Sequence, residues 1–210
     1  SDRGLNMAII SNATTIADAG AFSVNLGSMV LIKSLRASSA GDLSFVHGAS
    51  SVVLDGTYPI YQFRFVELHP GGNNVDFTFN MSIDSGSNYN VAKTSTFFQA
   101  ERSESGGGQL AYSTSDDSSQ ATGFQILSDA VGNDNDTSVN GFLTLFNPAS
   151  TTFAKHFASR ADGMYNSSYI VDCHCGGYAN TTSAVNAVQF KFASGNIDSG
   201  KIQLYGIKDS

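Results

Sequence analysis

The stretch NVDFTFNMSI, residues 74–83, decides the fold. Its apolar side chains recur at every second position, which is the period of a β-strand and not of a helix. Such alternation predicts an antiparallel strand with one face on the core and the other in water. The expected inward set is Val75, Phe77, Phe79, Met81 and Ile83, and the expected solvent-facing set is Asp76, Thr78, Asn80 and Ser82.

The segment before it, YPIYQFRFVELH (residues 58–69), is rich in aromatic and β-branched residues and also predicts a strand. Pro59 suits the start of that strand, where no backbone donor is lost from the sheet. The intervening HPGGNN, residues 69–74, has the composition of a turn. We therefore expect the two strands to form a hairpin.

Ten further short stretches have strand character, and clusters of Gly, Ser, Asn and Asp separate them. They span residues 29–37, 42–48, 94–102, 108–114, 123–127, 140–148, 151–160, 168–178, 184–192 and 200–207. No ten-residue window has a convincing helical stripe. Many short strands with such punctuation are typical of a sandwich or barrel. The expected fold is all-β, an antiparallel β-sandwich of jelly-roll type.

The chain has 210 residues, which suits one sandwich domain, since these run to roughly 200–250 residues. We expect that single domain to span residues 29–208, after an N-terminal arm at residues 7–28. Residues 1–6 are interpreted as an added remnant or a flexible tail ahead of a natural start at Met7. No sequence repeat and no interdomain linker is recognisable.

Composition excludes several classes of protein. The net charge of −7 argues against a nucleic-acid binder, which needs a basic face. No apolar run approaches the ~18 residues of a membrane-spanning helix, and no signal peptide is recognisable. Only 14% of residues are charged, so the surface must consist largely of Ser, Thr, Asn, Gly and Gln. We expect no membrane insertion.

The segment VDCHCGG, residues 171–177, holds both cysteines of the chain. If strand alternation continues, Tyr169, Val171, Cys173 and Cys175 share one face, whereas Ile170, Asp172 and His174 share the other. His174 could then not join the cysteines around one ion, and zinc sites normally need four ligands. The favoured interpretation is two small core residues. Metal binding and an intermolecular disulfide stay open as alternatives.

Catalytic motifs are not recognisable. There is no G-x-S-x-G elbow, and SGGGQ at residues 105–109 lacks the features of a phosphate loop. Asp134 and Asp136 alternate as calcium ligands do, but the complete D-x-D-x-D-G loop is absent, and Asp is common in turns for structural reasons. The sequence therefore predicts no catalytic residue, no cofactor and no metal site.

Several stretches together resemble a family of virion structural proteins from tailed bacteriophages, known from marine and environmental phage genomes. They are DGTYPIYQFRFVELHP (55–70), STFFQAER (95–102), GFLTLFNPASTTFAKHFASR (141–160) and GGYANTTSAVNAVQFKFASGNIDSGKIQLYGI (176–207). The resemblance covers most of the chain from Met29 to Ile207. It implies a tail-fibre or capsid-associated β-sandwich that is assembled in the host cytoplasm and carried in the virion.

Two functions are therefore expected in order. The first is a non-enzymatic fibre, spike, knob or capsid-decoration subunit whose partners are itself, as a homotrimer, and other virion proteins. The alternative is a module that recognises a host-surface glycan; Trp is lacking, but Tyr89, Tyr112 or Tyr165 could contact the sugar. An enzyme on a β-scaffold is the least favoured, because triad, phosphate-loop and metal chemistry all lack their residues.

Overall fold

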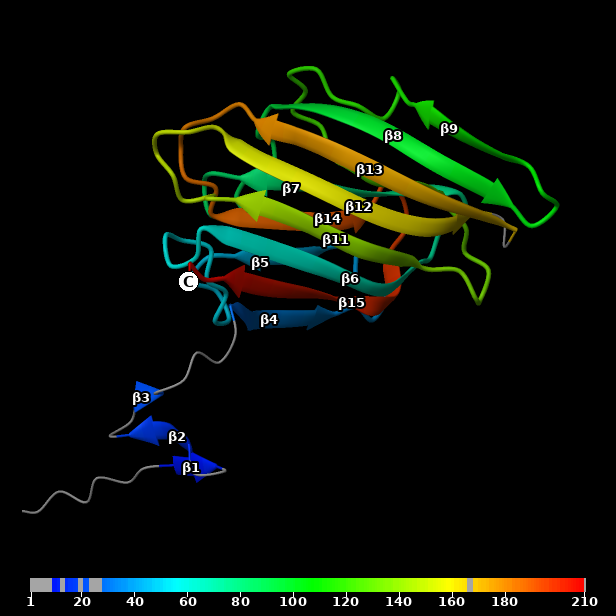
Figure 1. Ribbon diagram of the computed structural model, residues 1–210. Coiled ribbons are helices and arrows are strands. Elements are labelled where there is room, and N and C mark those ends of the chain that lie inside the picture. Colours follow the sequence, from blue (N-terminus) through cyan, green and yellow to red (C-terminus); the bar gives the residue numbers. More distant parts are fainter. Residues whose placement is uncertain (1–8, 12–13, 19–20, 23–27, 166–167, 210) are drawn as a thin grey trace, which may run out of the picture.

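The computed structural model describes the backbone of residues 9–11, 14–18, 21–22, 28–165 and 168–209, and the side chains of 28–165 and 168–209. Two antiparallel sheets pack face to face, as Figure 1 shows. The large sheet has the order β4 (Met29–Arg36), β15 (Ile197–Ile207), β6 (Ile60–Pro70), β11 (Val139–Phe146), β12 (Lys155–Tyr165), β13 (Tyr169–Ala179), β8 (Lys93–Ser103), β9 (Gly108–Tyr112). The small sheet has the order β10 (Gln125–Val131), β7 (Val75–Ser82), β14 (Ala187–Phe192), β5 (Leu43–Val46).

Eight of these strands have the order of a jelly roll: β4, β5, β6, β7, β10, β11, β14 and β15. Counted along the chain, the first, eighth, third and sixth lie side by side in the large sheet, and the second, seventh, fourth and fifth in the small one. The other four strands come from two insertions. One carries β8 and β9, the other β12 and β13, and together they widen the large sheet beyond β11. The predicted jelly-roll sandwich is confirmed.

The predicted hairpin between residues 58–69 and 74–83 is wrong. Its first strand is β6 of the large sheet and its second is β7 of the small sheet, so the turn carries the chain from one sheet to the other. The two strands meet through their side chains, with the rings of Phe65 and Phe77 edge to face at 5.0 Å. Their common apolar character reflects contact across the core and not backbone pairing.

The inward face of β7 agrees with the alternation except at its end. Val75, Phe77, Phe79 and Met81 are buried in the core. Ile83 follows the last residue of the strand and is 44% exposed, so its placement in the core is corrected.

The opposite face of β7 is not in water, which corrects the second half of that expectation. Thr78, Asn80 and Ser82 are all buried, and Asp76 is half-buried. The cause is the first insertion, whose connecting loops lie over this side of the small sheet. Asn80 donates from Nδ2 to the carbonyl oxygens of Tyr89 at 2.6 Å and of Thr122 at 3.0 Å. Local alternation cannot reveal a cover made by distant loops.

The centre of the core is a cluster of phenylalanine rings around Phe190 of β14. The Phe190 ring lies 5.1 Å from Phe63 and 5.3 Å from Phe65, both on β6 in the opposite sheet. It also contacts Phe77 and Phe79 on the neighbouring strand β7, at 6.1 and 6.2 Å. Offset and edge-to-face ring pairs at such distances stabilise a core beyond the burial of their area.

The N-terminal strands β1 (Ile9–Ser11), β2 (Thr14–Asp18) and β3 (Ala21–Phe22) pair only with one another, and Figure 1 shows them apart from the sandwich. They fall within the predicted arm. The interpretations placed on residues 1–6 and on Met7 lie outside the described residues. In the part of the chain that the structure covers, no helix has the length and hydropathy needed to cross a bilayer.

Candidate functional site

The cysteines lie where strand alternation places them. In β13, Val171, Cys173 and Cys175 point inward and are buried, and neither cysteine forms a disulfide. Burial raises the pKa of both thiols to about 12, so both stay protonated and weakly nucleophilic at neutral pH. Their interpretation as small core residues is confirmed.

His174 points to the opposite, outer face of the large sheet, as expected. Its ring stacks on Phe98 of β8, with centroids 4.8 Å apart and planes within 4° of parallel. Its Nε2 lies 3.4 Å from Asp172 Oδ2, and Arg160 donates two hydrogen bonds to the same carboxylate. This histidine therefore belongs to a surface network and not to the cysteines.

Asp134 and Asp136 lie in the loop between β10 and β11. The carbonyl oxygen of Asp134 accepts hydrogen bonds from the backbone N–H and the hydroxyl of Thr137, which is the geometry of a turn. Asp136 borders an open hollow of about 440 Å³ with His69 and Glu67. Among the described residues, no group of three or more His, Cys, Asp or Glu side chains is arranged to hold a metal ion.

The most developed polar site arises from a β-bulge in β10. The pairing of β10 with β7 shifts register between Ser128 and Val131, and Ala130 adopts a left-handed backbone conformation with φ of 53°. Asp76 of β7 holds the bulge through its Oδ1, which accepts from Ala130 N at 3.1 Å. Bulges commonly redirect a side chain next to a functional site. Here the redirected residue is Asp129.

The close approach of β10 to the large sheet depends on Gly163 of β12. A Cβ at this position would lie 2.8 Å from Ser128 Oγ and 3.4 Å from a methyl carbon of Val131. Any larger residue would push β10 outward and move the bulge. The hydroxyl of Ser128 is fully buried there and has no hydrogen-bond partner.

Asp129 borders a groove of about 450 Å³ between the edge strand β10 and the inner face of β8, β12 and β13, called the Asp129 groove below. Its lining residues are Asn74, Glu101, Asp129, Ala130, Tyr165, Tyr169 and Val171. Figure 1 shows why the space exists, because the inserted strands carry the large sheet past the edge of the small one. The rings of Tyr165 and Tyr169 lie 6.1 Å apart at 63°.

The carboxyl group of Asp129 has an unusual electrostatic environment. Burial is the main cause that raises its pKa to about 7. A hydrogen bond shared with Asp76 and the negative charge of Asp116 act in the same direction, whereas a hydrogen bond from Gln99 opposes them. Asp129 is therefore a carboxyl group that changes charge near neutral pH.

Gln99 of β8 connects the two acidic residues of the groove. Its Nε2 donates to Glu101 Oε1 at 2.6 Å, and its side chain also bonds Asp129. The residue is only 9% exposed, yet its Oε1 has no hydrogen-bond partner. A flipped amide would place Oε1 against the Glu101 carboxylate, so the orientation is set by charge.

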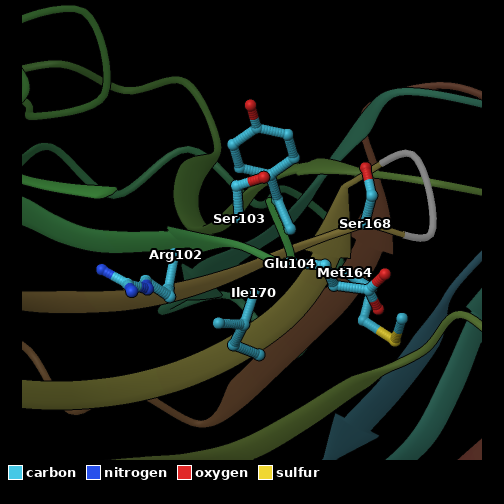
Figure 2. Close-up of a pocket in the computed structure, with 7 residues that line it drawn as sticks. Arg102, Ser103, Glu104, Met164, Ser168 and Ile170 are labelled. Carbon is cyan, nitrogen blue, oxygen red and sulfur yellow. The ribbon is translucent and has the colours of Figure 1, made fainter. Parts of the chain in front are cut away.

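A second hollow, of about 330 Å³, adjoins the groove and shares Tyr169 with it. Figure 2 shows its lining, which is Arg102, Ser103, Glu104, Met164, Ser168, Tyr169 and Ile170. In this view the Arg102 side chain extends away from Glu104 and Met164. The arginine therefore does not neutralise the carboxylate of Glu104 across the hollow.

Of the three tyrosines proposed for sugar contact, the structure brings only Tyr165 to the groove. Tyr112 lies on β9 at the far edge of the large sheet, where its hydroxyl donates to Asp117 at 2.6 Å. Tyr89 is half-buried in the loop after β7. Sequence reasoning missed Asp129, Glu101 and Tyr169. Glu101 did leave a signal, since it occupies an inward position of the stretch 94–102.

Searches against protein-family models, curated proteins and solved structures find no match to this chain.

Proposed function

We propose that this chain is a non-enzymatic virion structural protein, a fibre, spike, knob or capsid-decoration subunit, which works through contacts with copies of itself and with other virion proteins. The observation that carries the proposal is the apolar character of the outer face of the large sheet. Two further features support it: the jelly-roll fold, which viral capsid proteins share by analogy, and the low content of charge.

Ten large hydrophobic side chains of the described residues are exposed, and all but Ile83 and Phe153 lie on this outer face. They are Met29, Leu31, Phe98, Leu110, Tyr112, Phe142, Phe146 and Ile170. Single exposed apolar residues are ordinary, but their concentration on one face is typical of a surface that another protein covers.

A row of side chains crosses the same face at matched register positions of six adjacent strands. It consists of Tyr112, Phe98, His174, Arg160, Phe142 and Arg64, on β9, β8, β13, β12, β11 and β6. Aromatic residues and arginine are the types enriched at the centres of protein interfaces. A second copy of the chain is the occupant that we propose, and a closed trimer is the expected assembly.

The N-terminal arm offers a second contact between copies. A three-stranded sheet as short as β1–β3 buries too little surface to be stable alone in water. Packing of this arm on a neighbouring subunit would complete it. Assembly in the host cytoplasm also suits the two free cysteines, since cytosolic proteins keep their thiols reduced.

Sedimentation equilibrium at micromolar concentration tests the proposal. We expect a mass three times the 22.1 kDa of one chain. Phe142→Glu places a charge in the proposed interface and should give a monomer. Phe153→Glu is the matched control, because Phe153 is 69% exposed but lies off the outer face. A monomeric native protein, or equal effects of the two variants, would refute self-assembly through this face.

Glycan binding is the second candidate, and the Asp129 groove favours it. Tyr165 and Tyr169 offer ring surfaces, and Glu101, Asp129 and Asn74 offer polar atoms, which is the mixture found in small-ligand pockets. A glycan array with the native protein and with Tyr169→Ala tests this function. It is supported only if specific glycans bind and the variant loses them.

A further inference from the structure

The lining of the Asp129 groove has hydrogen-bond acceptors in excess of donors. Glu101 and Asp129 contribute carboxyl groups, and Asp76 and Asp116 add negative charge behind Asp129. Among the described lining residues, none is Lys, Arg or His. The groove therefore collects acidic groups on a half-buried surface with no counter-charge of its own.

Gln99 points independently to a missing donor. Its amide lies between Glu101 and Asp129, it is nine-tenths buried, and its Oε1 is left without a partner. A buried acceptor that makes no hydrogen bond costs about 1–3 kcal/mol, so native proteins rarely leave one unsatisfied without a reason. A ligand N–H or O–H group entering the groove would supply what Gln99 lacks.

The two tyrosines narrow the chemistry of the ligand. Their rings stand at 63° to each other beside the carboxyl groups, so a cation in the groove would meet aromatic surface as well as negative charge. Aromatic faces attract alkylammonium groups, and such sites bind amines in many proteins. A phosphate or sulfate ester would instead meet repulsion from every charged group of the lining.

We infer that the Asp129 groove binds a small ligand that carries a protonated primary amine, with the ammonium group between Glu101 and Asp129 and its carbon skeleton against Tyr165 and Tyr169. A volume of about 450 Å³ admits a unit as large as an amino sugar. This binding does not require the self-association proposed above.

The titration of Asp129 gives the binding a characteristic dependence on pH. The groups that face Asp129 are Asp76 on β7, Asp116 in the loop after β9, Gln99 on β8 and Cys173 on β13, and none of them is a cation. With a pKa of about 7, Asp129 is mostly neutral at acidic pH. An ammonium ligand must displace that proton, so its affinity should rise as the pH increases through this value.

Nuclear magnetic resonance titration of the full chain tests the inference with three probes: n-butylamine, glucosamine and glucose. The first two carry the amine, and glucose has the shape of the amino sugar without its charge. We expect saturable shifts of the backbone signals of Asn74, Glu101 and Asp129 with both amines and none with glucose. Equal affinity of the two amines would identify the ammonium group as the recognised part, whereas tighter glucosamine would add the sugar ring; both results support the inference.

Variants assign the binding to the groove. Asp129→Asn should weaken n-butylamine about tenfold or more, the effect of one charged hydrogen bond. Asp162→Asn is the matched control, because Asp162 lies on the outer face of β12 and should leave the affinity unchanged. Lowering the pH from about 8 to about 5 should also weaken n-butylamine tenfold or more, since alkylamines with a pKa near 10 stay charged.

Three results would overturn the inference. They are the absence of saturable binding by either amine, binding of glucose as tight as that of glucosamine, and an Asp129→Asn variant that binds n-butylamine as the native protein does. The spectrum of Asp129→Asn without ligand reports whether the variant is folded. If it is not, Glu101→Gln takes its place, with the same tenfold loss expected and the same conclusion if the loss is absent.

Discussion

Asn80→Ala is expected to destabilise the fold severely, although its position in the sequence alternation suggests an exposed and tolerant site. The side chain is fully buried beneath the loops of the first insertion. Its Oδ1 accepts from Lys93 Nζ at 2.7 Å, and its Nδ2 donates to two loop carbonyl oxygens. Alanine removes all of these interactions at once.

The magnitude follows from the groups left behind. Lys93 is itself fully buried and keeps two carbonyl acceptors, Val91 O at 2.9 Å and Gly123 O at 2.8 Å, so it loses one of three hydrogen bonds. A hydrogen bond to a charged group is worth about 1.5–3 kcal/mol, and each orphaned buried carbonyl costs about 1–3 kcal/mol. Partial entry of water reduces the sum, so we expect a loss of about 3–5 kcal/mol.

Urea unfolding followed by circular dichroism measures this loss. Asn90→Ala is the control, since Asn90 is exposed on the same loop and should change stability by less than about 0.5 kcal/mol. A double-mutant cycle with Lys93→Met should give a coupling of about 1.5–3 kcal/mol, because the two side chains share one bond. A loss below about 1 kcal/mol for Asn80→Ala would refute the argument that the insertion loops are fastened to β7 through this residue.

Three further predictions concern the core, the thiols and the bulge. Phe77→Ala should lower the unfolding free energy by about 3–5 kcal/mol in the same assay, and a loss under 1 kcal/mol would contradict its central place. Cys173 and Cys175 should react with a thiol reagent only as fast as the protein unfolds, and replacing both with Ser should leave the metal content unchanged; stoichiometric zinc in the native protein would contradict this. The raised pKa of Asp129 means that the folded state binds more protons than the unfolded state between about pH 4 and 7, so stability falls as the pH rises through that window. Asp129→Asn should remove part of this slope and add about 1–2 kcal/mol at pH 8, a value reduced for the partial exposure of the group; an unchanged slope, or the same change with the exposed control Asp209→Asn, would show that the environment of Asp129 is misjudged.

The strands could be predicted from the sequence because each of them alternates locally. Every stretch given a strand character contains one in the structure, and the inward residues of β7 and β13 are those that the alternation selects. The pairing of strands could not be predicted in the same way. Residues 58–69 and 74–83 are neighbours in sequence with a turn between them, and only the jelly-roll order places them in opposite sheets.

The groove illustrates what lies beyond such reasoning. Glu101, Asp129 and Tyr169 come from three strands that are far apart in the chain, and their meeting depends on a bulge that no local motif announces. Ala130 has a positive φ without being glycine or asparagine, so its conformation is imposed by the surrounding contacts and not by its own preference. Asp129 is a turn residue by composition and a half-buried acid only by tertiary structure.

The pairing of β4 with β15 has a consequence for how the protein is made. Met29 pairs with Ile207, so the first strand of the sandwich must wait for the last before its inner edge is covered. During synthesis on the ribosome, the sheet stays open until nearly the whole chain has emerged, and folding with such distant contacts is slow. Because these two ends lie side by side, joining them and opening the chain at the exposed loop of residues 105–107 should yield a circularly permuted protein with the same sandwich, in which β4 and β15 become neighbours on the nascent chain.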